Sequence, residues 1–226
     1  KNAGTFDLNA ACAGFVTATE TATHYIRSGS VNNVLVVGAY AMSKYLDKTD
    51  KKTVTLFADG ARAIILSGTE EKNKGHQVGK LISQGQYADW MGIYAGGTNT
   101  PLSEKVLQNN DHKLKFVKKF PPELNPKMWS SLAYELADKM DIEVSMVDHF
   151  FITQININAI WETLRILGLE KNKAHTVMHN YGYTGSACIP IAFHEAWQQQ
   201  KINEGDTLFF IGSGGGLAFA ANAFIL

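Results

Sequence analysis

The apolar residues of the chain follow a helical spacing in some segments and form short unbroken runs in others. Small and apolar side chains recur on one helix face over residues 13–26, and Ser28-Gly29 then ends that segment as helix C-caps commonly do. The run Val34-Leu35-Val36-Val37 is short and unbroken, which predicts a buried strand. By the same criteria we expect further strands at 4–8, 61–66, 147–153, 208–212 and 217–225, and further helices near 126–140, 155–167 and 184–197.

The order of these elements occurs twice. A helix start rich in small residues, a helix, a strand, a turn and a strand begin at Cys12 and again at Ser186. The first strand of each set ends in a glycine at the same distance from these residues, at Gly38 and Gly212. Strands alternate with helices, so the class is α/β, with two similar halves packed face to face. We expect the first half to be incomplete in this chain, and we divide the sequence into an N-terminal half at 1–85, a loop-rich connection at 86–125 and a C-terminal half at 126–226.

Composition and charge narrow the classes of function. Of the 226 residues, 45% are apolar and 19% are charged, and the formal net charge at pH 7 is zero. This composition is ordinary for a globular protein, and the neutral charge argues against nucleic acid or an anionic membrane as the main partner. No apolar run reaches the ~20 residues of a membrane span. The only cysteines, Cys12 and Cys188, are too few for a disulfide framework, which favours a reducing, cytoplasmic setting.

Cys12 is the first candidate for chemistry. It falls where the expected strand 4–8 passes into a helix, and helix N-termini carry free N–H groups and a positive dipole end. A thiol there is expected to have a lowered pKa and to act as a nucleophile, and the alanines and Gly14 around it leave room for a substrate. The alternative is an inert buried cysteine, the commoner role of a free cysteine. We assign that role to Cys188, which lies one turn inside its own helix.

The run SGGGL at 213–217 is the second candidate. Consecutive glycines can present a backbone N–H to the oxyanion that develops during acyl transfer. A triple glycine is as often a tight turn.

Several motifs in order resemble the β-ketoacyl-acyl-carrier-protein synthase III family of the thiolase-like superfamily. They are FDLNAACAGF, IRSGSVNNVLVVG and DKTDKKTVTLFADGARAIIL in the first half, and YGYTGSACIPIAFHEA and GDTLFFIGSGGGLAFAANAFIL in the second. The resemblance covers nearly the whole chain and is weakest across 86–125.

The resemblance implies a five-layered αβαβα fold, usually as a homodimer, that needs no metal or other cofactor. In the family, the cysteine matched by Cys12 takes an acyl group from an acyl-CoA or acyl-carrier thioester. A malonyl-carrier extender then loses CO2 and attacks the acyl-enzyme. The oxyanion hole is formed by backbone N–H groups, here those of Cys12 and Gly215. Phe57 matches a pocket-lining phenylalanine, and Lys51 matches a basic residue that contacts CoA.

The sequence departs from the family where malonyl is decarboxylated. The family's histidine begins an HQAN motif; this chain has TQIN, so Thr153 takes the histidine's place and Asn156 keeps the asparagine that ends the motif. The second decarboxylation residue, the asparagine of GNTSAA, is replaced by Tyr183, and an arginine that contacts CoA is replaced by Asn158. A threonine does not titrate near neutral pH, although it and a tyrosine can each donate one hydrogen bond. For His149 and His179, the nearest histidines in sequence, we expect structural roles.

Three interpretations follow from this departure. The first is an acyl-thioester transferase that acylates Cys12 for lipid or polyketide-type condensation, with doubtful decarboxylation. The second is a non-catalytic subunit of a heterodimeric condensing enzyme. The third is a binding module for acyl chains. The intact cysteine and the glycine turn favour the first.

Overall fold

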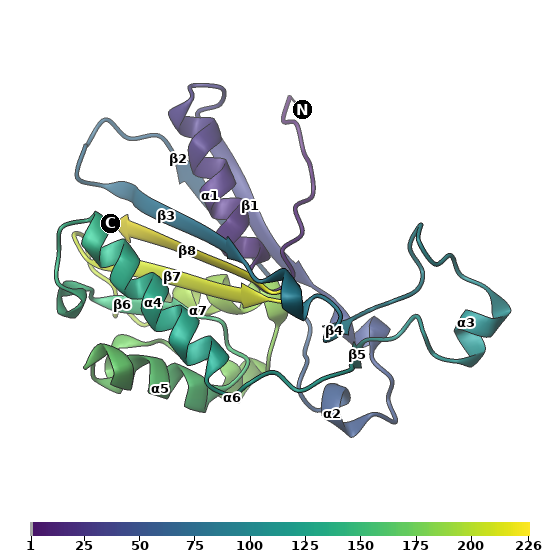
Figure 1. Cartoon of the computed structure of the whole chain (residues 1–226). Coiled ribbons are helices and arrows are strands. Elements are labelled where there is room, and N and C mark those ends of the chain that lie inside the picture. Colours follow the sequence, from purple (N-terminus) through teal and green to yellow (C-terminus); the bar gives the residue numbers. More distant parts are fainter. Residues whose placement is uncertain (1) are drawn as a thin grey trace.

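The computed structural model describes residues 2–226, which form two main sheets (Figure 1). The smaller sheet pairs β1 (Asn33–Tyr40) with β2 (Gly60–Ser67) in antiparallel fashion. The larger sheet has the strand order β3-β8-β7-β6. In it β6 runs parallel to β7, and the other neighbours are antiparallel. Its strands are β3 (Gly75–Ser83), β6 (His149–Ile152), β7 (Thr207–Gly214) and β8 (Ala218–Ile225).

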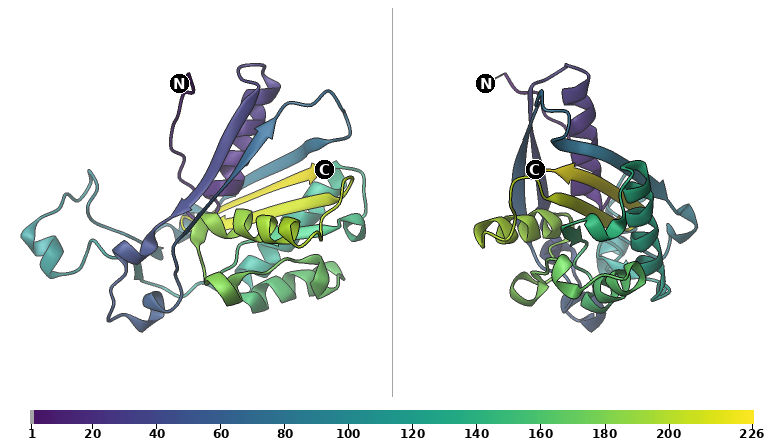
Figure 2. Two further views of the ribbon diagram at one scale, coloured as in Figure 1. Left: turned by 180° about the vertical axis from the view of Figure 1, so that it is seen from behind. Right: turned by 90° about the vertical axis from the view of Figure 1, so that its left-hand side faces the viewer.

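Two helices lie between the sheets and two more cover the outer side of the larger one (Figure 2). α1 (Gly14–Arg27) packs on β1 on one side and on β7 and β8 on the other. α7 (Cys188–Gln198) contacts β2 and β6. α4 (Leu124–Lys139) packs on β3, β7 and β8, and α5 (Ile157–Leu167) packs against α4. The layers therefore follow the order sheet, helices, sheet, helices.

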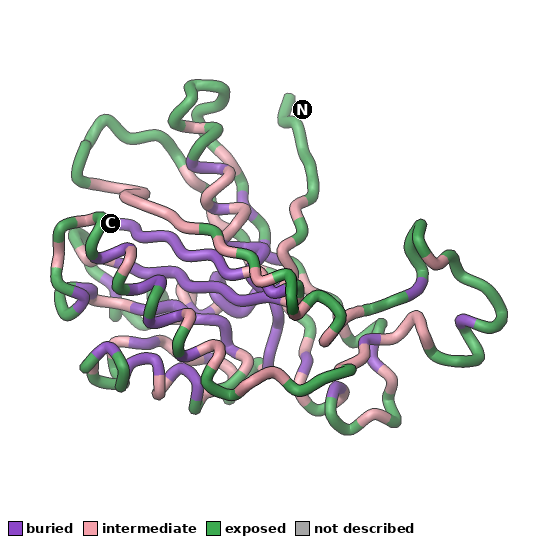
Figure 3. Tube along the Cα trace, in the orientation of Figure 1, coloured by how far each residue is buried: buried purple, intermediate pink, exposed green. Residues whose placement is uncertain are grey.

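β7 separates two hydrophobic cores. Leu208 and Phe210 belong to the core around α1 and α7, whereas Phe209 and Ile211 belong to the core around α4 and α5. A strand covered on both faces has no polar alternation, which explains the unbroken apolar run in the sequence. Figure 3 shows β7 and β8 buried along nearly their whole length.

Short elements form the region around residues 41–57 and 85–123, which extends from the layered body in Figure 1. β4 (Met91–Gly92) pairs with β5 (Lys115–Phe116) in a third small sheet.

The other short elements are spread over the structure. The short α-helices are α2 (Lys51–Val54), α3 (Glu104–Gln108) and α6 (Met178–Tyr181). Single turns of 3-10 helix lie at Met42–Tyr45, Gly85–Tyr87, Val144–Met146, Lys171–Lys173 and Gly185–Ala187.

The two halves meet through reciprocal close contacts of glycines. A methyl group added to Gly38, on β1, would lie 2.7 Å from the carbonyl oxygen of Ser186 at the start of the C-terminal helix layer. A methyl group added to Gly212, on β7, would lie 3.1 Å from Cα of Ala13 at the start of α1. β1 and β7 thus each need a glycine where the strand passes the helix start of the other half. The repeat seen in the sequence is therefore also a repeat in space.

Two sequence expectations differ from the structure. Residues 4–8 form no strand: the segment is mostly exposed, with Phe6 at 66%, and pairs with none of the strands among residues 2–226. A strand is stabilised by a ladder partner, which local propensity does not supply. The polar segment 75–83 forms β3 because β8 offers it an edge. By its sheet, β3 belongs with the C-terminal strands, although the sequence division at residue 85 places it in the N-terminal half.

Candidate active site

The chain makes a tight bend at Cys12. Ala11 has a positive φ of 48°, which is uncommon for a residue with a side chain, and its N–H donates to Asn9 Oδ1 at 2.8 Å. The N–H of Ala13 then donates to the carbonyl of Ala10 at 3.1 Å, and α1 begins at Gly14. The end of β7 lies against this bend, because a methyl group added to Gly214 would lie 2.8 Å from the Cys12 nitrogen. Cys12 is thus held in place from two sides.

Cys12 opens onto a cavity of about 420 Å³, within the size range of small-molecule sites. The thiol residue is only 4% exposed. Three predicted site residues, Gly215, Tyr183 and Asn156, line the same cavity. The rest of the wall is mostly apolar and comes from the short elements and from α4, α5 and β7: Leu56, Met91, Phe116, Lys119, Phe120, Pro121, Pro122, Leu124, Asn125, Ile155, Ala159, Ser213, Gly214 and Leu217. The structure therefore brings Cys12, Gly215 and Tyr183 to one cavity.

Aromatic side chains from both halves belong to the same core cluster as Cys12. Tyr183 is 3% exposed, and its ring centroid lies 5.5 Å from that of Phe57. Phe57 also lies 6.2 Å from Phe116, in a stacked arrangement, and 6.4 Å from Tyr40. The backbone is joined here too, since the N–H of Ala58 donates to the carbonyl of Tyr183 at 2.9 Å. Phe57 thus acts as a wall that positions Tyr183, although it does not itself line the cavity.

The pKa of Cys12 differs from the sequence expectation. Burial raises the pKa of the thiol above its ordinary value, and hydrogen bonds donated by the Tyr183 and Tyr40 hydroxyls lower it by less. The expectation of a lowered pKa considered only the helix start. Removing a thiolate from water costs more free energy than hydrogen bonds from two neutral donors restore.

Thr153 is fully buried behind the end of β7. Its Oγ1 accepts a hydrogen bond from the N–H of Ser213 at 2.8 Å, and its own N–H donates to the Ile211 carbonyl at 3.0 Å. Thr153 is not among the residues that line the cavity. Its observed contacts hold the strand end that carries Ser213 and Gly214 in the cavity wall.

The remaining predicted binding residues lie at different depths. Asn156 caps α5 by accepting from the N–H of Asn158 at 2.9 Å. The side chain of Asn158 is exposed, and so is Lys51 at the start of α2. Neither of these two lines the cavity. Any contact that they make with a substrate would therefore be outside it.

The histidines nearest to Thr153 in sequence lie elsewhere. His149, at the opposite end of β6, bonds Asp206 Oδ2 through Nε2 at 3.0 Å and meets His175 Nε2 through Nδ1 at 2.9 Å. Burial, and then the charge of His149, lowers the pKa of His175 to about 4. His179 is exposed on α6. The contacts of His149 agree with the structural role expected for it.

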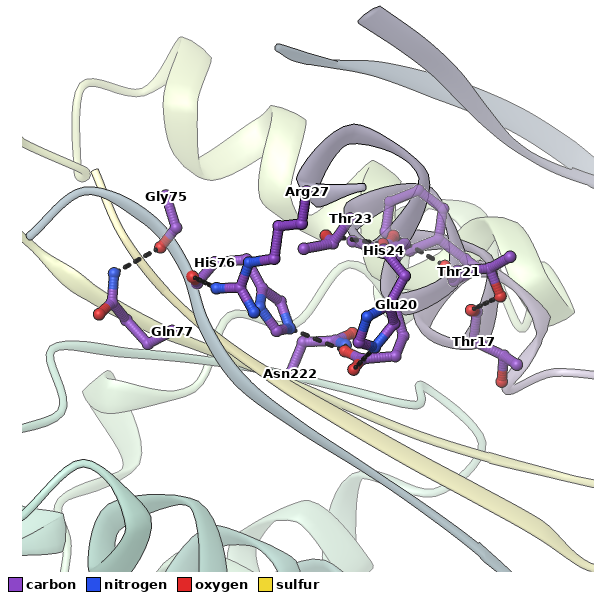
Figure 4. A network of polar contacts seen from close by, with 12 residues as sticks. Thr17, Glu20, Thr21, Thr23, His24, Arg27, Gly75, His76, Gln77 and Asn222 are labelled. Carbon is purple, nitrogen blue, oxygen red and sulfur yellow. Dashed lines mark hydrogen bonds and ion pairs between the residues drawn. The ribbon is translucent and has the colours of Figure 1, made fainter. Parts of the chain in front are cut away.

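A second polar cluster ties the middle of α1 to the larger sheet (Figure 4). Glu20 accepts from Asn222 Nδ2 at 2.6 Å, and its carboxylate lies 2.7 Å from His76 Nε2 and 3.0 Å from His24 Nε2. Arg27 donates to the carbonyl of His76 at 2.6 Å. Burial raises the pKa of Glu20, but the hydrogen bonds and charge of His76 and the contacts with Asn222 and His24 lower it more. The helix that begins after Cys12 is thus anchored to β3 and β8.

Sequence reasoning missed part of the cavity. Tyr40, at the end of β1, and the lining residues Met91, Lys119 and Phe120 were not predicted as site residues. Tyr40 lies outside the cavity lining, at the end of a strand that the sequence did predict. The others lie in the stretch where the family resemblance is weakest. Within residues 2–226 no cluster of His, Cys, Asp and Glu could hold a metal ion, and no helix is both long and apolar enough to cross a bilayer.

Comparison with known proteins gives consistent matches. The family model described as 3-oxoacyl-[acyl-carrier-protein (ACP)] synthase III matches residues 6–85, and the model of its C-terminal part matches residues 137–225. A β-ketoacyl-[acyl-carrier-protein] synthase III of Aliarcobacter butzleri is 36% identical over 223 residues, covering 99% of this chain and 67% of that protein. One of Clostridium perfringens is 34% identical, covering 98% of this chain and 68% of that protein. The chain thus spans about two thirds of the length of these relatives.

Solved structures agree with these matches. A 3-oxoacyl-[acyl-carrier-protein] synthase III from Aquifex aeolicus superposes with a TM-score of 0.87 at 27% identity, covering 100% of this chain and 68% of that one. The priming β-ketosynthase of the R1128 polyketide pathway has a TM-score of 0.89, covers 100% of this chain and 66% of that one, and at 24% identity shows the shared fold alone. The predicted thiolase-like α/β fold is confirmed.

Proposed function

Because the chain belongs to the 3-oxoacyl-[acyl-carrier-protein] synthase III family of acyl-transferring synthases, we propose that Cys12 accepts an acyl group from an acyl-CoA or acyl-carrier thioester. One observation carries the proposal. Cys12 lies at the start of a helix and on the wall of a mainly apolar cavity that it shares with Gly215 and Tyr183. A thiol in that position can reach a thioester whose acyl chain occupies the apolar space.

The acyl transfer needs few groups beyond these. The Cys12 thiolate attacks the carbonyl carbon of the thioester, and a new carbon–sulfur bond forms as the carbonyl oxygen gains negative charge. Backbone N–H groups of Cys12 and Gly215 would stabilise that oxyanion. The bond to the original sulfur then breaks, and the leaving thiolate takes up a proton equivalent to the one that Cys12 lost. Neither Thr153 nor a histidine is needed for this half of the reaction.

The second half-reaction, decarboxylative condensation, has fewer hydrogen-bond donors at the site to support it. Loss of CO2 from a malonyl thioester leaves an enolate whose oxygen needs hydrogen-bond donors, and removing one such donor typically costs ~10²–10³ in rate. Thr153 is fully buried, and its Oγ1 accepts the Ser213 N–H. Tyr183 can donate, and burial keeps its pKa well above the ordinary value, so it stays neutral. We therefore propose that acylation is retained and that condensation with malonyl-carrier is weak or absent.

The other parts of the proposal concern assembly and setting. We propose a homodimer, or a heterodimer with a related subunit, in the cytoplasm, acting in lipid or polyketide-type synthesis. The alternative functions, a non-catalytic partner subunit and an acyl-binding module, both predict that no covalent adduct forms on Cys12. Light scattering at micromolar concentration tests the dimer, and a clean monomer would contradict it.

One experiment separates acylation from condensation. The protein is mixed with acyl-CoA thioesters of increasing chain length and followed by intact mass, and CO2 release from malonyl-carrier is followed in parallel. We expect a stoichiometric acyl adduct and CO2 release close to background. The double variant Thr153→His with Tyr183→Asn, which restores the family pair, is expected to raise CO2 release more than acylation. Rapid CO2 release by the unchanged protein would refute the proposed division between the two half-reactions.

A further inference from the structure

We propose that Lys119 is a specificity-determining residue that pairs with a carboxylate on the acyl group, so that the cavity selects carboxyacyl thioesters over neutral ones. The inference rests on the proposed acylation of Cys12. Lys119 and Cys12 line the same cavity. Within residues 2–226, Lys119 is the only lysine, arginine, aspartate or glutamate in that lining. The wall therefore carries one full positive charge and no carboxylate to balance it.

The backbone that carries Lys119 is held in place. The N–H of Val117 donates to the carbonyl of Trp90 at 2.8 Å, and the N–H of Lys118 donates to the same carbonyl at 3.2 Å. On the other side of Lys119, the Phe120 ring stacks on that of Trp90, with the two centroids 5.5 Å apart. Phe120 also lines the cavity. Lys119 is thus presented to the cavity by a segment that is fixed on both sides.

The ammonium group of Lys119 is available to a ligand. Within residues 2–226 it takes part in no ion pair. The neighbouring Lys118 differs, since its Nζ lies 5.5 Å from the centroid of the Trp90 ring. Lys119 is exposed, whereas Cys12 is 4% exposed, so the lysine lies at the part of the cavity that meets solvent. A lysine ammonium has three donors and no acceptor, and its complement is an anion.

Other groups in the lining favour the same charge. Asn125 lies in the first turn of α4 and Asn156 caps α5, and both line the cavity. Their amides can donate hydrogen bonds, and helix starts favour negative charge. These neutral groups add to the lysine, which supplies the full charge.

The anion that fits this place best is a carboxylate on the acyl group. A thioester can also carry a phosphate, but that group is at the far end of the pantetheine arm, many bonds from the sulfur. The carbonyl under attack must lie at Cys12, and a cavity of about 420 Å³ has room beside it for a short acyl group. The carboxyacyl group would be loaded with its carboxylate intact, which agrees with the weak decarboxylation proposed for this site.

The test compares two acyl groups of similar length. Succinyl and pentanoyl thioesters of N-acetylcysteamine carry no phosphate, and the succinyl carboxylate is not β to the thioester, so it is not lost as CO2. Lys119→Met removes the charge and keeps most of the shape, and Lys118→Met makes the same change outside the lining. We expect Lys119→Met to slow succinylation of Cys12 about three- to tenfold, less so at high salt, and to leave pentanoylation within about twofold. Lys118→Met should change neither rate by more than about twofold.

Alkylation gives a readout that does not depend on acylation. Iodoacetate and iodoacetamide differ by one negative charge, and peptide mapping gives their rates at Cys12. We expect the ratio of the iodoacetate rate to the iodoacetamide rate to fall about threefold in Lys119→Met and to stay constant in Lys118→Met.

The outcomes separate the two proposals. Equal effects of Lys119→Met on succinylation and pentanoylation would overturn the role of Lys119. A loss seen with CoA thioesters but not with those of N-acetylcysteamine would assign Lys119 to the phosphate and overturn the carboxylate. If no thioester acylates Cys12, the proposed function is refuted, and the alkylation ratio alone decides for or against Lys119.

Discussion

Cys12 and Cys188 lie near equivalent helix starts in the two halves, yet their surroundings differ. Cys12 precedes α1 by two residues and contributes to a cavity wall that it shares with Tyr183. Cys188 is the first residue of α7, has no exposed surface, and accepts a hydrogen bond from the Gln154 N–H at 3.4 Å. Burial raises the pKa of both thiols, that of Cys188 to about 12.

This difference shows that a helix start alone does not make a reactive cysteine. Both thiols lie at the positive end of a helix in the same layer, and for both the loss of water is the largest influence on the pKa. Only Cys12 combines that position with a cavity. Access therefore distinguishes the two sites, and it can be tested by measuring how fast each thiol reacts.

The largest expected difference lies in thiol alkylation. At pH 8 a thiol with a pKa of about 12 has only ~10⁻⁴ of its population as thiolate, so Cys188 should be inert in the native protein. Cys12 should be labelled by iodoacetamide at least ~100-fold faster, at a rate that rises toward alkaline pH because its pKa is raised. Peptide mapping after timed labelling measures the ratio. Equal labelling of the two cysteines would remove the distinction.

The next largest effect should come from the strand end that faces Cys12. A methyl group in Gly214→Ala would lie 2.8 Å from the Cys12 nitrogen and 2.9 Å from that of Ala13. Displacing the bend is expected to slow acylation about 100-fold and to lower the free energy of unfolding by about 1–3 kcal/mol. Gly97→Ala is the matched control, since nothing lies within 4 Å of its added methyl group. Similar acylation rates in the two variants would contradict a fixed geometry at Cys12.

Two variants of Thr153 test whether the cavity wall beside Cys12 depends on a buried hydrogen bond. Thr153→Val keeps the shape but leaves the Ser213 N–H without its acceptor, which should cost about 1–3 kcal/mol of unfolding free energy. Thr153→Ser keeps the oxygen and should cost about 1 kcal/mol or less. Chemical denaturation measures both. If the valine variant is as stable as the serine variant, the hydrogen bond does not hold the strand end.

The smallest effect concerns Glu20, which anchors α1 behind Cys12. Its folded pKa lies below the unfolded value of about 4.3, so its contribution is fully present above that pH and is lost as pH falls through the folded pKa. Glu20→Gln should therefore lower the free energy of unfolding by about 1–2 kcal/mol at pH 7, and by less at pH 3.5. Glu195→Gln on α7, whose carboxylate meets the exposed Tyr181, should change stability little. A loss in Glu20→Gln that stays constant with pH would rule out the ionised carboxylate as its source.

The sequence predicted the layered order of helices and strands because their apolar spacing is strong, as in α1 and β7. It also indicated Cys12 and Gly215 through their motifs. It missed β3, a polar strand formed because β8 offers it an edge, and it placed a strand at 4–8 that pairs with no strand within residues 2–226. It could not show that the Thr153 hydroxyl bonds the Ser213 N–H, because that hydrogen bond joins two segments that are distant in the sequence.

The most direct test of the account is to locate the acyl group. The protein is incubated with an acyl-CoA thioester, digested and mapped by mass spectrometry, with Cys12→Ala and Cys188→Ser treated in parallel. We expect one acyl group per chain on the peptide that contains Cys12, absent in Cys12→Ala and retained in Cys188→Ser. An adduct on Cys188, or none on either cysteine, would contradict the claim that the first half of the molecule carries the nucleophile.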